Sequence, residues 1–233
     1  MRVNRYALSV CAALLLAGCG GSQPPGNSIP AATLARNSRS PLTRGAGDLL
    51  YVLTPFTSHG ADLIMYSFPG GKRVRSFYSD SPFESADRMC SDTSGNVWFV
   101  TGLSGGRAGV VEFAHGGDSP IATLIDPPSA GTPNACAVDP RTGNLALATG
   151  PYIAVYAQAR GNPKYYTVPN IQSFYGCAYD AWGNLLVGGV ARAPIPFAFL
   201  AYGHSSFTKI TVNHKFNEGS FIQWDGKRLG HFG

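Results

Sequence analysis

Apolar residues in this chain fall in short runs that are separated by Gly, Pro, Asn and Asp. Several runs alternate apolar and polar positions or stay apolar for a few residues only, as at 63–68, 110–113, 153–156 and 197–202. Such runs between turn-forming residues are typical of β-strands. No segment has the apolar period of a long amphipathic helix, and the frequent Gly and Pro oppose one. The pattern predicts an all-β fold.

The first apolar run has a different character. Arg2 and Arg5 precede an apolar stretch over 7–17, which ends in Leu16-Ala17-Gly18-Cys19. A basic start, a short apolar core and a small-residue cleavage site make up a signal peptide. The core is too short for a permanent membrane helix, which needs about 20 apolar residues. The Leu-Ala-Gly-Cys order resembles the lipobox of bacterial lipoproteins.

That resemblance implies removal of residues 1–18 and lipid attachment to Cys19, the first residue of the mature chain. More than one acyl chain makes such an anchor stable. Gly rather than Asp at position 20 implies the outer membrane, if the organism has two membranes. An ordinary secretory signal with a coincidental Cys is the alternative. Residues 19–46 are rich in Ser, Pro and Ala without periodicity, so we expect a flexible tether.

A repeat follows the tether and defines the domain 47–233. Asp92-Thr-Ser-Gly-Asn recurs as Asp139-Pro-Arg-Thr-Gly-Asn and as Asp180-Ala-Trp-Gly-Asn, each before an apolar run. Degenerate copies lie at Asp225 and, without its first half, at Gly47. The anchor glycines 47, 95, 143, 183 and 226 are spaced by 48, 48, 40 and 43 residues. Gly and Asn accept the positive φ of hairpin turns, so each motif predicts a hairpin.

Each unit predicts four short antiparallel strands, which is the pattern of a β-propeller blade. Full blades are expected at about 86–125, 134–168 and 175–212. The domain opens with the second, third and fourth strands only, and it ends with an inner strand over 221–225 and a further strand. We therefore expect a β-propeller of four-stranded antiparallel blades, with about four blades present.

The Asp-x-x-Gly-Asn repeat resembles that of the NHL-like and gluconolactonase-like propeller superfamily, which includes streptogramin-lyase-like proteins. Relatives commonly have six blades, so the resemblance implies a truncated larger propeller; a small closed ring or an open arc are the alternatives. It also implies either a His-based lyase site or a divalent metal held by acidic and Asn ligands. We align no matching His here, and the three Glu form no matching set. We therefore assign no catalytic residue, no metal and no cofactor.

Charge and cysteine content narrow the picture further. The chain has 18 basic and 13 acidic residues, and removal of residues 1–18 leaves 16 basic residues without a basic cluster. Nucleic-acid binding needs such a cluster, so we do not expect it. After processing, Cys90, Cys136 and Cys177 remain. Neighbouring blades diverge from the axis, so we expect buried free thiols beyond the roughly 7 Å Cα separation that a disulfide tolerates. One disulfide, or a metal or redox site, are the alternatives.

Two sets of polar residues are candidates for function. The repeat aspartates could form a metal-binding ring, but recurrence in every unit favours turn residues that accept backbone N–H bonds. The loops that lead into the inner strands line one axial mouth of a propeller, which is the expected ligand site. They contribute Glu84, Asp87, Asn134, Gln172, Tyr175 and Glu218.

The function that these features favour is a lipid-anchored envelope protein whose propeller binds a partner. An envelope protein, a glycan or a small polar ligand would suit the mouth. A propeller hydrolase or lyase, of the lactonase or streptogramin-lyase type, is the alternative.

Overall fold

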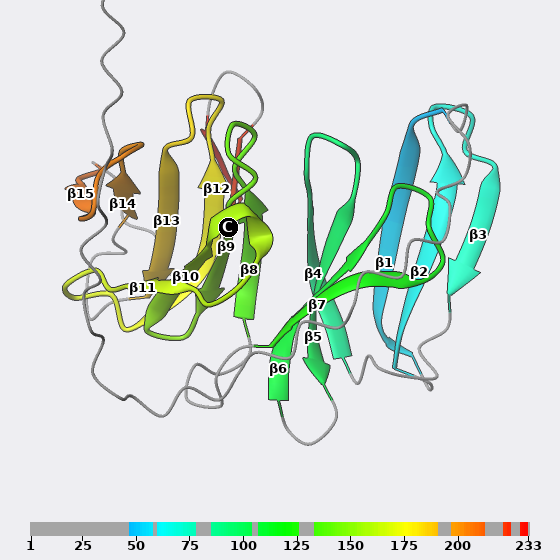
Figure 1. Cartoon of the computed structure of the whole chain (residues 1–233), viewed down its shortest axis with the longest axis horizontal. Helices are drawn as coiled ribbons and strands as arrows, with labels where there is room; N and C mark the ends of the chain where they lie inside the picture. Colours follow the sequence, from blue (N-terminus) through cyan, green and yellow to red (C-terminus); the bar gives the residue numbers. More distant parts are fainter. Residues whose placement is uncertain are drawn as a thin grey trace, which may run out of the picture. The chain divides into compact units, whose positions relative to one another are not determined.

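The computed structural model describes residues 47–57, 60–77, 85–103, 107–125, 133–190, 197–212, 221–224 and 229–232. All of them belong to one compact unit, Ala31–Gly233. They form five antiparallel sheets, which follow one another in chain order (Figure 1). The strands of each sheet are also in chain order, so the sequence prediction of an all-β fold built from meandering sheets is confirmed.

The first sheet has three strands, and the next three sheets have four each. Their bounds are β1 Leu49–Thr57, β2 Gly60–Ser67 and β3 Arg73–Phe77; β4 Ser85–Ser91, β5 Val97–Leu103, β6 Arg107–Phe113 and β7 Pro120–Ile125; β8 Pro133–Val138, β9 Leu145–Thr149, β10 Tyr152–Tyr156 and β11 Lys164–Tyr166; β12 Ser173–Tyr179, β13 Leu185–Val190, β14 Phe197–Leu200 and β15 Thr208–Ile210. A single 3-10 turn, η2 Ala157–Ala159, follows β10. The fifth sheet pairs β16 Phe221–Trp224 with β17 Leu229–Phe232.

These bounds match the three full blades expected from the repeat. The first sheet has no inner strand among the described residues, as the sequence indicated, because β1 pairs only with β2. Among the described strands, β16 forms a hairpin with β17 and no ladder joins it to β1.

The sheets pack face to face because their central strands alternate between two apolar faces. On β5, Val97 and Phe99 pack toward the first sheet, whereas Trp98 and Val100 pack toward the third. The same alternation on β9 separates leucines, which face the second sheet, from alanines, which face the fourth. Each of these side chains is at most 3% exposed. The hydrophobic core therefore consists of layers between sheets, and a strand without two apolar faces could not occupy these positions.

The first sheet corrects the repeat alignment by one residue. Aligning Gly47 with Gly95 would place Leu50 and Val52 against the second sheet, in the positions of Trp98 and Val100. Instead Tyr51 and Leu53 pack there, while Leu50 is 48% and Val52 36% exposed. Because a slip of one residue exchanges the two faces of a strand, Asp48 and not Gly47 occupies the position of the turn glycine.

The repeat aspartates organise the turns, as the turn hypothesis predicted. Asp180 Oδ1 accepts the backbone N–H of Trp182 and of Asn184, each at 2.9 Å, and its Oδ2 accepts the Asn184 side-chain amide at 2.7 Å. The Asn184 Oδ1 atom in turn accepts the N–H of Tyr202, which follows β14. One Asp and one Asn thus join three consecutive strands of the sheet. Asp92 and Asn96 make the same set of bonds in the second sheet.

The third sheet reaches the same result with a longer turn. Asp139 lies one residue further from its Asn, so Thr142 takes over and donates its hydroxyl to the Asp139 carboxylate. Asn144 still accepts an N–H from the residue that follows its third strand, here Gln158. A Cβ at Gly183, where φ is +81°, would lie 3.1 Å from Asp139 Oδ1, so the turns of the third and fourth sheets are in direct contact. The Asp225 copy lies outside the described residues.

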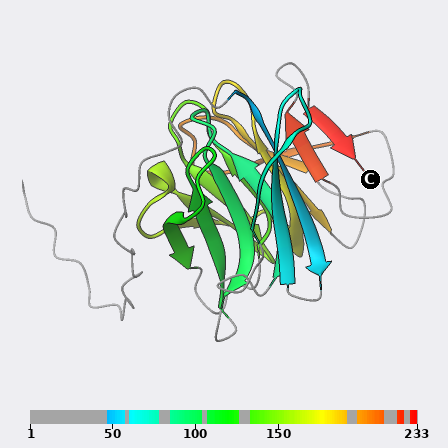
Figure 2. The same ribbon diagram turned by 90° about the vertical axis from the view of Figure 1, so that its right-hand side faces the viewer.

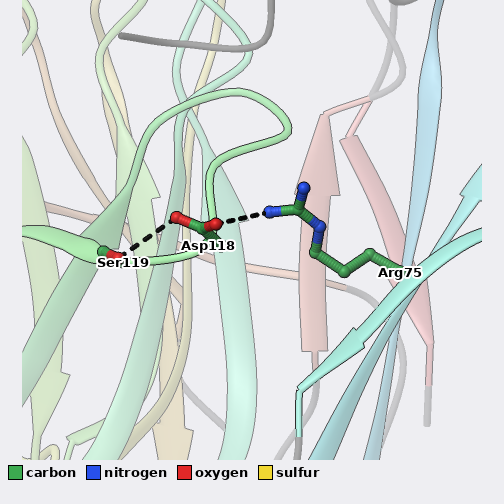
Figure 3. A network of polar contacts seen from close by, with 3 residues as sticks. All are labelled: Arg75, Asp118 and Ser119. Atoms are coloured by element: carbon green, nitrogen blue, oxygen red, sulfur yellow. Dashed lines mark hydrogen bonds and ion pairs between the residues drawn. The ribbon is translucent and has the colours of Figure 1, made fainter. Parts of the chain in front are cut away.

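One ion pair links the first two sheets at their surface. Arg75 on β3 lies 2.9 Å from Asp118 in the turn between β6 and β7, and Ser119 donates its hydroxyl to the other carboxylate oxygen (Figure 3). Tyr51 accepts the N–H of Gly116 in the same turn at 2.7 Å. Both side chains of the ion pair are solvated, so we expect it to contribute little to stability.

Two aspartate substitutions separate these contributions. Asp180→Ala removes an acceptor for three donors at a position that is 6% exposed, so we expect a loss of about 3 kcal/mol in the free energy of unfolding. Asp118→Ala removes only the exposed pair, so we expect a loss of at most about 0.5 kcal/mol. Urea unfolding followed by tryptophan fluorescence measures both values. Equal losses would contradict the structural role given to the turn.

Candidate functional site

The C-terminal ends of the inner strands border a cavity of about 750 Å³. The ends of β4, β8, β12 and β16 contribute to it, together with β1 of the first sheet. All five sheets therefore meet at this one place, as they would around a propeller axis. Its lining residues are Leu50, Tyr51, Met89, Cys90, Ser91, Asp92, Thr93, Val97, Cys136, Ala137, Val138, Pro140, Cys177, Ala178, Tyr179, Gln223 and Trp224.

The polar groups of this cavity are mostly uncharged. Asp92 is the one carboxylate in the lining, and its oxygens accept the bonds of its own turn. Burial raises the pKa of the Tyr179 hydroxyl, and the neighbouring Cys177 and Asp139 raise it further. Burial also raises the pKa of Tyr51, against the lowering effect of its bond from Gly116. The cavity thus offers hydroxyl and amide groups within an apolar wall, which suits an uncharged polar surface of a ligand.

The expectation of three free thiols is wrong, because Cys90 and Cys136 form a disulfide with a Cα separation of 5.7 Å. Cys136 lies three residues before its repeat aspartate, but Cys90 lies two before its own. Side chains alternate along a strand, so this difference points Cys90 toward the third sheet while Cys136 points back toward the second. The inner strands are also where neighbouring blades lie closest, so the assumed divergence does not apply there.

Cys177 is buried and remains a free thiol. It has the same offset as Cys136, so it points back toward the third sheet, where its Sγ lies 3.8 Å from the Ala146 carbonyl oxygen. No second cysteine faces it from that sheet among the described residues. Burial raises the pKa of the Cys177 thiol to about 12, which makes it unreactive at neutral pH.

The predicted mouth residues lie at the opposite, N-terminal ends of the inner strands, and three of them share one structural position. Asp87, Asn134 and Tyr175 each lie five residues before the repeat aspartate of their unit. Each is skipped in the ladder to the second strand, so each is the extra residue of a β-bulge. Bulges turn a side chain away from the regular pleat and are frequent near binding sites.

The structure assigns different surroundings to these residues. The Asn134 side-chain amide donates to the Phe174 carbonyl at 2.8 Å and so connects β8 to β12. Tyr175 is 40% exposed, and Gln172 is exposed, with its backbone N–H bonded to Val190. None of these three lines the cavity. Glu84, Glu218 and Cys19 lie outside the described residues, and the side chain of Asp87 is not described. A site at this end remains a prediction.

Sequence reasoning missed a cluster of exposed side chains beside the cavity. Trp182 is 62% exposed, and its ring lies 6.0 Å from that of Trp224 in an edge-to-face contact. Arg141 donates to the Trp182 carbonyl oxygen at 2.8 Å and lies 4.3 Å above the Tyr202 ring. Arg141 and Trp182 each lie two residues after a repeat aspartate. The two positions inside the Asp-x-x-Gly-Asn motif were thus the signal, because they vary between units while the framework does not.

A second cavity, of about 550 Å³, lies between the second and third sheets. Trp98, Glu112 and Leu124 line it on one side and the η2 turn on the other. Gln158 and Ala159 of that turn have φ near +50°, where the other sheets use glycine. This cavity opens away from the inner strands and gathers fewer sheets than the axial one, so we regard the axial cavity as the candidate site.

The described residues contain no group of three His, Cys, Asp or Glu side chains placed to hold a metal ion. The same part of the chain has no helix of the length and apolarity that crossing a membrane requires.

Comparison with known proteins adds the fold class. No protein family and no curated protein matches the sequence. Among solved structures, TolB from Acinetobacter baumannii aligns with a TM-score of 0.58 at 15% identity, over 79% of this chain and 46% of that one. The Dos1 propeller aligns with the same TM-score at 10% identity, over 79% and 48%. The fold is a β-propeller.

Two other structures complete the comparison. A chain of a nidogen/laminin complex aligns with a TM-score of 0.57 at 10% identity, over 78% of this chain and 84% of that one. Streptogramin B lyase aligns at 0.49 and 14% identity, over 62% and 46%, which is too weak to transfer a mechanism. This propeller chain spans about half of TolB, the Dos1 propeller and the lyase. At these identities the likeness concerns the fold alone.

Thiol accounting tests the cysteine assignment. In the native full chain we expect Cys177 to resist iodoacetamide up to about pH 9, because its thiol stays protonated. After unfolding without reductant Cys177 alone should be alkylated among the three domain cysteines, and after reduction all three. A thiol whose pKa is raised on folding stabilises the fold below its unfolded pKa of about 8.5. That contribution falls as the pH rises toward 12.

Peptide mapping by mass spectrometry reads out each cysteine separately. Alkylation of Cys90 or Cys136 before reduction would contradict the disulfide, and rapid native alkylation of Cys177 would contradict its burial.

Proposed function

We propose that this chain is an exported, lipid-anchored propeller that binds a ligand in the axial cavity at the C-terminal ends of its inner strands. The observation that carries the binding role is the convergence of five sheets on one cavity of about 750 Å³. That volume lies within the range of small-molecule sites. Its mixture of apolar walls and uncharged polar groups supports recognition of a ligand rather than chemical attack on it.

The chemistry of the lining favours binding over the hydrolase or lyase alternative. A general base or a metal ligand needs a carboxylate that faces the substrate. The Asp92 carboxylate accepts three hydrogen bonds within its own turn, and the cavity thiol Cys177 is protonated at neutral pH. The other half-cystines of the lining are joined to each other. No described side chain of this cavity is therefore poised as a nucleophile.

The N-terminal sequence supports the anchor. The Leu-Ala-Gly-Cys order follows a short apolar core, and a lipid on Cys19 would tether the propeller through residues 20–46. A tether of Ser, Pro and Gly leaves a domain free to orient toward its ligand.

Substitution of the lipid-attachment residue tests the anchor. When the full chain is expressed in a bacterium with an alkyne-labelled fatty acid, we expect label and membrane association for the wild type. Cys19→Ser should lose the label and move to the soluble fraction, because one thioether-linked site carries the lipid. Cys11→Ser, within the same N-terminal segment, is the matched control and should behave as wild type. A labelled Cys19→Ser protein would contradict the proposal.

Blocking the cavity tests the binding role. Thr93 and Ala181 occupy the same turn position in neighbouring sheets and are both exposed, but only Thr93 lines the cavity. In a thermal-shift screen of small polar compounds and sugars, ligands should raise the Tm of the wild type and of Ala181→Trp. Thr93→Trp should abolish those shifts without lowering the Tm of the free protein. Shifts that survive Thr93→Trp would place the ligand elsewhere, including the bulge positions.

A further inference from the structure

We propose that the edge of the axial cavity at Arg141, Trp182 and Trp224 is a subsite for an acidic oligosaccharide. A sugar ring would lie on the exposed indole of Trp182, and its carboxylate would pair with Arg141. This inference rests on the proposed binding function and names its ligand class.

The aromatic pair offers a fixed apolar surface to a ring. Trp182 and Trp224 contact each other edge to face, at an interplanar angle of 68°, so the face of one indole is not consumed by the other. Trp224 belongs to the cavity lining, and Trp182 extends the surface outward from it. The Trp182 backbone is held at both polar groups, because its N–H bonds to Asp180 and its carbonyl oxygen to Arg141. A rigid, exposed indole binds a flat ligand at low entropic cost.

Arg141 adds a cation within the span of one residue. Its own N–H donates to Asp139 Oδ1 at 2.9 Å, and its guanidinium rests on the Tyr202 ring. Of the guanidinium donors, the described structure pairs one, with the Trp182 carbonyl. The remaining donors can bind a carboxylate in the forked geometry that arginine favours. Because the guanidinium is already stacked and bonded, little rotamer freedom is lost on binding.

The adjoining wall complements sugar hydroxyls. Tyr179 stays protonated because burial raises its pKa, and Ser91, Thr93 and Gln223 line the cavity as further neutral groups. Each of these can donate and accept hydrogen bonds, as sugar hydroxyls do. Apolar faces, neutral polar groups and a single cation together match a hydroxylated ring that carries one acid per unit.

Other ligand classes fit this edge less well. A nucleic acid needs several cations along its phosphates, whereas Arg141 is the one cationic side chain in the contacts of this cluster. A cationic ligand would be repelled by Arg141. An aliphatic ligand would leave the neutral hydrogen-bonding groups of the wall unpaired, at a cost for each.

Binding to matched saccharides tests the inference. The full chain, purified in detergent, is titrated with trigalacturonic acid, with a hyaluronate hexasaccharide, and with neutral α-1,4-galactotriose. We expect an acidic saccharide to bind and to change the tryptophan emission, and to bind about ten-fold more tightly than the neutral trisaccharide. Isothermal titration calorimetry supplies the affinities.

Three substitutions divide the site into its parts. Trp182→Ala should weaken every saccharide at least about ten-fold, because the ring surface is lost. Arg141→Gln should remove the preference for the acidic saccharides and leave the affinity for galactotriose unchanged. Tyr165→Ala is the matched control, since Tyr165 is 40% exposed in an edge-to-face pair with Tyr152 but does not line the cavity. It should bind as wild type.

The outcomes separate this inference from the proposed function. Absence of binding to both acidic saccharides, or unchanged binding by Trp182→Ala, overturns the inference. If other ligands still shift the Tm in a manner that Thr93→Trp abolishes, the axial binding role stands without it. If saccharides bind and Trp182→Ala weakens them while Thr93→Trp does not, the sugar subsite stands and the axial cavity is not its continuation.

Discussion

The turn carboxylate of the repeat is the interaction on which the rest of this structure depends. In each sheet where the turn is described, an aspartate at the end of the inner strand gathers the N–H groups of the following turn. The asparagine that follows then accepts an N–H from the end of the third strand. Three strand ends are thereby fixed by two side chains. Short strands with weak individual pairing can form a sheet only if their ends are held in this way.

Fixed strand ends also fix the register, and the register determines the core. Because side chains alternate, each central strand sends one set of apolar residues to the preceding sheet and the other set to the next. The views in Figures 1 and 2 show the sheets presenting these faces to one another in chain order. The first sheet has the same two faces, but Leu50 and Val52 on its outer face are exposed. That face is a packing surface by composition, equivalent to Val97 and Phe99, which the first sheet covers in the second.

The sequence was sufficient for the fold because the repeat encodes it locally. The Asp-x-x-Gly-Asn motif specifies the turn, and the apolar runs on either side specify strands, so blade bounds could be read without long-range information. The disulfide could not be derived in the same way, because it depends on how closely Cys90 and Cys136 approach across two sheets. The offset of Cys90 was visible, but its meaning required the direction in which each inner strand points its side chains. The axial cavity likewise depends on which ends of the inner strands converge.

The same framework explains why the functional residues are hard to find from sequence. Residues that recur in every unit, such as Asp92 and Asp180, are occupied in building the turn, so recurrence marks structure here rather than chemistry. Function has room only at positions that the framework leaves free. Two such positions exist in each turn, and in successive sheets they hold Thr93-Ser94, Pro140-Arg141 and Ala181-Trp182. Three of these six residues line the axial cavity and two others, Arg141 and Trp182, contact each other beside it. In a fold built from repeats, the side chains that differ between equivalent positions are therefore the ones that can give the axial face its specificity.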